Sequence, residues 1–309
     1  LWRERARREL EREAQAQFTH DGVNREQAFA YHVFSCEFLC VAALVGAASG
    51  QPFSAQYFDV IGRALGFLSS VRDVGGNVPM VGDADDGAVW RLDPGASDRA
   101  GLLLSLGSAM AGLAPDSATA RWLLHAFPGP PRGHPMPQAG WAFPDGGYLL
   151  FGRDFGAPSE IKGMVDCGPL GYLGIAAHGH ADALSLTLSV AGEPCLVDPG
   201  TYSYWCELKW RDYFRGTSAH NTVCVDGADQ SVSGGRFMWL RKARSRVERM
   251  PGSPGQFDFR GSHDGYLRLA DPARHVRDVK FDDASLTLSV TDRVEAARVH
   301  RVEQFWHVA

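Results

Sequence analysis

Apolar side chains in the first 126 residues follow the spacing of buried and amphipathic helices. Residues 1–17 are rich in Ala, Arg and Glu, which favour helices, and residues 26–48 form a long stretch that is apolar on most sides. The helical pattern returns at 54–71, at about 98–113 and at 116–126. A helix that is apolar on most sides is buried among other elements. We therefore expect an all-helical domain at residues 1–126.

The hydrophobic period changes to two after residue 140. Residues 127–140 contain five prolines, which prevent a long regular element, so we take this segment as a linker. The alternating stretches that predict strands are 147–155, 185–192, 221–227, 241–250, 255–261, 274–283, 284–294 and 299–309. Gly, Asp and Pro turns separate them, which favours an antiparallel β-sandwich at residues 141–309 and an α+β protein with two domains.

Charge and composition limit the partners of the chain. Of its 309 residues 45% are hydrophobic, and 31 basic and 36 acidic residues give a formal net charge of −5. The basic residues are spread along the chain, which predicts no broad cationic surface for nucleic acid or anionic lipid. No apolar run approaches the ~20 residues needed to span a bilayer, so we expect no membrane insertion. The six cysteines include no CxxC pair and are expected as buried thiols.

Two histidines and an aspartate open a stretch that otherwise favours β-structure. If residues 178–182 were extended, His178, His180 and Asp182 would project from one face, because side chains alternate along a strand. Histidines on an apolar sheet face are costly unless each ring nitrogen finds a partner. The pattern therefore favours a metal site or a hydrogen-bonded catalytic cluster over a chance arrangement.

Asp198 and His220 are the candidate partners of this histidine pair. Two histidines and a carboxylate are a common set of zinc ligands, with a fourth position open or filled by water. A simple hairpin, however, would hold Asp198 roughly 20 Å from His180 at ~3.3 Å per extended residue. A zinc site therefore requires residues 180–185 to fold back as a turn or short helical loop. A straight strand at these residues would exclude it.

Three further segments carry polar or aromatic residues that suit a ligand. Residues 210–221 contain arginines and a tyrosine, which bind carboxylates and donate hydrogen bonds, and we expect them to form a loop. At the start of the long apolar helix, Gln27 and Tyr31 share a face, with Asn24 close by. The acidic turn at 82–87 has neither the ligand alternation nor the distant Glu of a calcium loop. We expect it to be a structured turn or the edge of a substrate site.

Together these segments resemble the heparinase II/III-like polysaccharide lyases. The resemblance is strongest at 165–231, where the patterns H-x-H-x-D-A-x-S, D-P-G-T-Y and R-x-T-x-A-H-N-T follow one another. The other segments that carry it are 21–32, 78–87 and 300–307. The resemblance implies an incomplete (α/α) toroid followed by an antiparallel β-sandwich, with a cleft between them for an acidic polysaccharide.

The resemblance also implies a reaction, which is β-elimination at a uronic acid residue. By position, Tyr31 resembles the proton-transferring tyrosine and His178 the catalytic or charge-neutralising histidine. His180, Asp198 and His220 resemble the ligands of a structural zinc ion. The candidates for substrate binding are Asn24, Gln27, Tyr202, Tyr204, Tyr213, Arg215 and Asn221. The resemblance further implies a periplasmic or secreted protein, and a homodimer is possible.

One departure from the family pattern keeps other functions open. Members usually supply an Asn-His pair upstream of the tyrosine to bind the uronate carboxylate, and the thirty residues before Tyr31 contain no such pair. We expect the chain to be a fragment of a longer lyase. The alternatives are a hydrolase that uses the same metal to activate water and a non-catalytic polysaccharide-binding or assembly protein. Glycosaminoglycans and alginate both remain candidate substrates.

Overall fold

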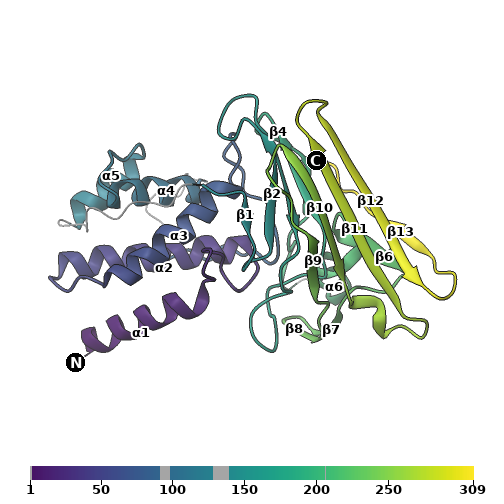
Figure 1. Ribbon diagram of the computed structural model, residues 1–309. Helices are drawn as coiled ribbons and strands as arrows, with labels where there is room; N and C mark the ends of the chain where they lie inside the picture. Colours follow the sequence, from purple (N-terminus) through teal and green to yellow (C-terminus); the bar gives the residue numbers. More distant parts are fainter. Residues whose placement is uncertain (1, 91–97, 128–138, 206) are drawn as a thin grey trace.

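The computed structural model describes residues 2–90, 98–127, 139–205 and 207–309. Its N-terminal half is helical, and each predicted helix is confirmed within a few residues at its ends. The helices are α1 Trp2–Gln17, α2 Phe29–Ala48, α3 Ala55–Val71, α4 Arg99–Met110 and α5 Ala118–Ala126. They lie side by side in Figure 1 and share one buried apolar core, so they form a single layer, here called the helical layer.

Local sequence signals fix where three of these helices begin. Ser54, Asp98 and Ser117 precede α3, α4 and α5, and each side chain accepts a hydrogen bond from a backbone N–H of the first turn. Such caps satisfy donors that have no partner inside the helix, and each typically contributes about 1 kcal/mol.

Helix α2 differs from the expectation that no apolar run is long enough to cross a bilayer. By length and composition it could cross a membrane, because a window average tolerates the polar residues within it. In the structure half of that window is buried. Glu37 in its middle is also buried and pairs with Arg99 of α4 at 2.7 Å. A buried carboxylate needs such a partner, and these contacts make α2 a central element of the helical layer.

The C-terminal half contains two main antiparallel sheets. In the first, the spatial order follows the chain: β1 Ala142–Phe143, β2 Tyr148–Arg153, β3 Ile161–Asp166, β4 Leu186–Val190 and β5 Glu193–Leu196. The second has the order β12 Thr287–Ala296, β11 Ala273–Asp282, β10 Gln256–His263 and β9 Ser245–Arg249. Two short ribbons complete it, β13 Val302–Gln304 with β6 Val223–Val225 and β7 Val232–Gly235 with β8 Met238–Arg241.

Strand β2 shows how the layers stack. Leu149 and Phe151 enter a core that they share with Phe257 and Phe259 of the second sheet, which confirms the predicted sandwich. Their neighbours, such as Leu150, enter another core shared with helices α2 and α3. Alternate residues of a strand face opposite sides, so the first sheet is covered on both faces. Figure 1 shows the resulting order of helical layer, first sheet and second sheet.

Several short elements were not expected. Strands β1, β3, β7 and β8 were not predicted, and helix α6, Leu208–Arg215, occupies a segment expected as a loop. Four of the cysteines, Cys36, Cys40, Cys167 and Cys224, are buried free thiols as expected, whereas Cys195 is free but only partly buried. Cys206 and most of the proposed linker, residues 128–138, lie outside the described residues. The domain boundary at 127–140 therefore stays a prediction.

The second sheet contains its own buried histidines. His263 Nε2 lies 3.1 Å from His275 Nδ1, and His275 Nε2 lies 2.8 Å from an oxygen of Asp292. The backbone N–H of Gly265 donates to His263 Nδ1 at 3.2 Å. Every ring nitrogen of His263 and His275 therefore has a hydrogen-bond partner. Arg277 also pairs with Asp292, at 2.7 Å.

Candidate functional site

The turn required for a metal site is present between the histidine motif and the first sheet. Residues 178–185 form turns and bends, and strand β4 begins only at Leu186. The N–H of Ser185 donates to the carbonyl of Asp182 at 2.8 Å, and Leu184 adopts a left-handed φ of 62°. The chain therefore folds back after His180 and does not continue as a straight strand.

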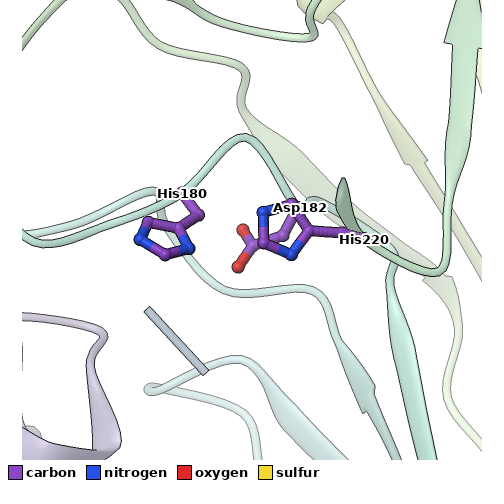
Figure 2. Close-up of side chains that lie close together, drawn as sticks. All are labelled: His180, Asp182 and His220. Carbon is purple, nitrogen blue, oxygen red and sulfur yellow. The ribbon is translucent and has the colours of Figure 1, made fainter. Parts of the chain in front are cut away.

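This turn gathers three potential ligands. Ligand atoms of His180, Asp182 and His220 all lie within 4.8 Å of one another, and all three residues are buried. Figure 2 shows the two imidazole rings on either side of the Asp182 carboxylate. This group of residues could hold a metal ion, since two imidazoles and a carboxylate are a usual donor set for zinc.

The hydrogen bonds of the two imidazoles fit such an ion. His180 Nε2 lies 2.9 Å from Asp83, and His220 Nδ1 lies 2.7 Å from Asp198. The other nitrogen of each ring, Nδ1 of His180 and Nε2 of His220, is buried and has no hydrogen-bond partner among the described residues. Metal-binding histidines commonly use one nitrogen for the ion and the other for a carboxylate. The structure reproduces this pattern twice.

Asp182 and Asp198 occupy different places around His220. Asp198 was predicted as a ligand, but in the structure it pairs with His220 Nδ1, and Asp182 completes the group of three. Burial lowers the pKa of His220, but the charge of Asp198 outweighs it and raises the pKa to about 9. Burial raises the pKa of Asp182 to about 7. A buried carboxylate of this kind is stabilised by a nearby cation.

Asp83 connects the helical layer to this group. It lies in the segment between α3 and α4, is fully buried, and forms a two-point ion pair with Arg211 of α6 at 2.5 and 2.6 Å. It also contacts His178 Nδ1 at 3.3 Å, in addition to His180. Burial raises the pKa of Asp83, but the hydrogen bonds from His178, His180 and Arg211 outweigh it and hold the pKa far below its usual range.

Tyr31 lies beside His178 on the helical side of the junction. Their rings stack with centroids 3.9 Å apart and planes 22° apart. The Tyr31 hydroxyl donates to Asp85 at 2.9 Å and lies 2.9 Å from the hydroxyl of Tyr204. Burial, together with the nearby aspartates, raises the pKa of Tyr31 to about 12. The predicted tyrosine and histidine are therefore in direct contact, and the phenol is protonated near neutral pH.

Two predicted substrate-binding residues face the interior. Arg215 is buried, its guanidinium lies 4.4 Å from the Trp239 ring centroid, and it donates to the carbonyl of Gly235. Asn221 is buried too, and its amide donates to the carbonyls of Leu186 and Val197. These contacts hold the chain together and leave neither side chain at a surface that a polysaccharide reaches.

The other candidates lie at three depths. Tyr202 and Tyr213 are exposed, and Tyr204 is half-buried next to Tyr31. Asn24 and Gln27 are buried, and neither amide atom of Gln27 has a hydrogen-bond partner among the described residues. Of the predicted substrate-binding residues, the tyrosines are therefore the ones that are open to a ligand.

Helices that cover a β-sandwich, with a histidine and carboxylate group at their junction, define a toroid-and-sandwich protein with a candidate metal centre. Residues 135–309 match the family described as "Heparinase II/III-like, C-terminal". Residues 1–92 match the "Heparinase II/III N-terminus". The chain therefore belongs to the heparinase II/III-like family, as the sequence motifs predicted.

Solved structures of other members share the fold. The heparan sulfate lyase HepC from Pedobacter heparinus superposes with a TM-score of 0.71 at 17% identity, over 100% of this chain and 44% of that one. A structure of heparinase III gives a TM-score of 0.69 at 16% identity, over 94% of this chain and 43% of that one. The chain thus spans less than half the length of these relatives. None of the curated proteins compared with it matches.

Proposed function

We propose that this chain carries part of the active site of a polysaccharide lyase, which cleaves a uronic acid polymer by β-elimination. The observation that carries the proposal is the stacked pair of Tyr31 and His178, held at the junction of the helical layer and the first sheet. It joins a proton-transfer group to a group that can neutralise charge. Membership of the heparinase II/III-like family supports the same reaction.

The reaction needs charge stabilisation before a proton can be removed. When C5 of the uronate loses its proton, negative charge builds on the neighbouring carboxylate, and a positive or donating group must meet it. Asp83 holds His178 through Nδ1, so a protonated His178 can donate from Nε2 to that carboxylate. Arg215, the other group considered for this role, is buried against Trp239 and is not part of the proposal.

Tyr31 supplies the proton transfers. Asp85 accepts its hydrogen bond at 2.9 Å and is placed to take the phenolic proton, which leaves a phenolate as base. The phenolate takes the C5 proton, and that electron pair forms the C4–C5 double bond as the bond from C4 to the leaving oxygen breaks. The re-formed phenol then gives its proton to the leaving oxygen. The raised pKa of Tyr31 makes its phenolate a stronger base toward the C5 proton.

A structural zinc ion fits the buried group below this pair. We propose His180, Asp182 and His220 as its ligands, with Asp83 and Asp198 orienting the two imidazoles. When bound, the ion supplies a fixed positive charge that balances the buried carboxylates. These residues hold the turn at 178–185 and therefore the position of His178. Because the ligands are buried, the group suits a structural ion better than one that activates water for hydrolysis.

The substrate class follows from the relatives and stays part of the proposal. One matched structure is a heparan sulfate lyase, which favours a glycosaminoglycan over alginate. A periplasmic or secreted location, where such polymers are met, agrees with the family. The proposed homodimer stays a prediction.

The test is to incubate the full-length protein with heparan sulfate, chondroitin sulfate and alginate, and to follow the ultraviolet absorbance of unsaturated product. We expect product from a glycosaminoglycan and a loss of about 100-fold or more in Tyr31→Phe, since acid–base groups typically contribute that much. Tyr172→Phe is the matched control, because its hydroxyl bonds the backbone of Ala16 in α1. Saturated products would support hydrolysis, and binding without any cleavage would support a non-catalytic role.

A further inference from the structure

A row of aromatic rings leads from the candidate site to the surface. Phe237 lies at its centre, with ring centroids 6.2 Å from His178, 5.1 Å from Tyr204 and 6.2 Å from Trp205. Trp205, at the outer end, is 79% exposed. An exposed indole offers a large, flat apolar face on which a ligand ring can stack. Because Phe237 separates it from His178, Trp205 lies next to the reacting pair and is not part of it.

A positive charge accompanies this ring. The guanidinium of Arg236 lies 5.9 Å from the Trp205 ring centroid, and it donates to the carbonyl of Tyr204 at 2.6 Å. The surface at the outer end of the row therefore combines an aromatic face with a cation. That combination matches a sugar ring that carries an anionic group, because a pyranose has an apolar C–H face and charged substituents at its edge.

We propose that Trp205 and Arg236 form a subsite for one anionic sugar residue, outside the pair of residues joined by the cleaved bond. The inference rests on the proposed lyase function and names a further part of its substrate site. The sugar ring stacks on the indole, and a carboxylate or sulfate group meets the guanidinium. We expect chains longer than a disaccharide to gain this contact, because Trp205 lies on the far side of Phe237 from His178.

The test measures binding of heparan sulfate decasaccharide and disaccharide to the full-length protein by isothermal titration calorimetry. All variants carry Tyr31→Phe, so the sugar is bound but not consumed. Trp205→Ala is expected to weaken decasaccharide binding about ten-fold and to leave disaccharide binding unchanged. Trp205→Phe, which keeps an aromatic face, is expected to lie between the two. Trp122→Ala on α5, which also removes an exposed tryptophan, is the control and should change neither affinity.

Four outcomes would overturn the subsite. They are equal affinity of Trp205→Ala and its parent for the decasaccharide, an equal loss with both sugars, the same loss in Trp122→Ala, and no decasaccharide binding by the parent. Failure of the lyase proposal has a different signature. If the protein with Tyr31 intact makes no unsaturated product but binds the decasaccharide through Trp205, the reaction is refuted and the subsite is supported.

Discussion

The two buried histidine groups differ in what their ring nitrogens contact. In the second sheet, His263 and His275 form a closed series in which each nitrogen has a hydrogen-bond partner. At the junction of the layers, His180 and His220 each keep one buried nitrogen without a partner among the described residues, both beside Asp182. Buried polar atoms are nearly always paired, so two unpaired nitrogens beside a carboxylate identify a group that could hold a metal ion. An unpaired ring nitrogen is therefore a better indicator of a metal site than the burial of the histidine alone.

The hydrogen bonds of His263 and His275, here called the closed group, also fix the protonation state of both rings. Since Gly265 donates to His263 Nδ1, the proton of His263 is on Nε2 and is donated to His275 Nδ1. His275 then donates from Nε2 to Asp292. Both rings must be neutral for this series to hold. Burial, together with Arg277 and the neighbouring ring, lowers the pKa of His263, and burial lowers that of His275.

The largest expected effect comes from breaking the support of the junction group. Asp83→Ala leaves Arg211 buried without its partner, and His178 and His180 each lose a hydrogen bond. Removing one side of a buried ion pair costs about 3–5 kcal/mol, so we expect the free energy of unfolding to fall by that amount. Urea unfolding monitored by circular dichroism measures it. Asp59→Ala, an exposed change on α3, should shift it by less than about 0.5 kcal/mol.

Substituting a proposed zinc ligand distinguishes the two buried histidine groups by their metal content. His220→Ala is expected to lower zinc affinity by more than about 100-fold, beyond the usual effect of an outer partner. Metal analysis after dialysis against a zinc buffer measures this. His275→Ala should leave zinc content unchanged, because its nitrogens are occupied within the second sheet. Equal zinc content in His220→Ala and the parent would remove the metal assignment.

Asp198→Asn sharpens the distinction between ligand and orienting residue. If Asp198 only orients His220 through Nδ1, as the structure has it, zinc affinity should fall by about 10–100-fold. Asp182→Asn should lower the affinity further, because its oxygen belongs to the ligand group. Competition with a chromogenic chelator gives both values. The reverse order would exchange the roles of the two aspartates.

The smallest expected effect is the pH dependence of the closed group. A histidine whose folded pKa lies below its unfolded value of 6.5 contributes stability above that pH, and the contribution is lost as the pH falls. The groups that face His263 are His275, Arg277, Arg268 and Asp292. We expect the free energy of unfolding to decrease on acidification below pH 6.5. In His263→Gln the decrease should be shallower, and a steeper one would contradict the assignment.

The spacing of apolar residues along the sequence predicted the long helices and strands but missed several short elements. Strand β3 was missed because Lys162 and Gly163 interrupt the alternation; Lys162 is buried only because it donates to the carbonyl of Arg72 and pairs with Glu160. Helix α6 was missed because its exposed aromatic residues obscure the helical period. Both depend on contacts with distant segments, which a local pattern does not contain.

The site was predictable where its residues are close in sequence. The motif at 178–182 and its condition, a turn before β4, could be stated in advance because strand geometry limits the reach of the chain. Asp83 could not be assigned, since its partners His178 and Arg211 lie 95 and 128 residues away. The acidic turn at 82–87 was the available signal. The inward direction of Arg215 likewise depends on Trp239 of the β7–β8 ribbon.

The position of Asp83 has a consequence for exchanging parts between related proteins. Its carboxylate comes from the helical layer, whereas Arg211 and both imidazoles that it contacts come from the sheet side. A chimera that takes only the sandwich from this chain would inherit three basic side chains and lose the acid that neutralises them. The transferable module is therefore the sandwich together with the segment between α3 and α4.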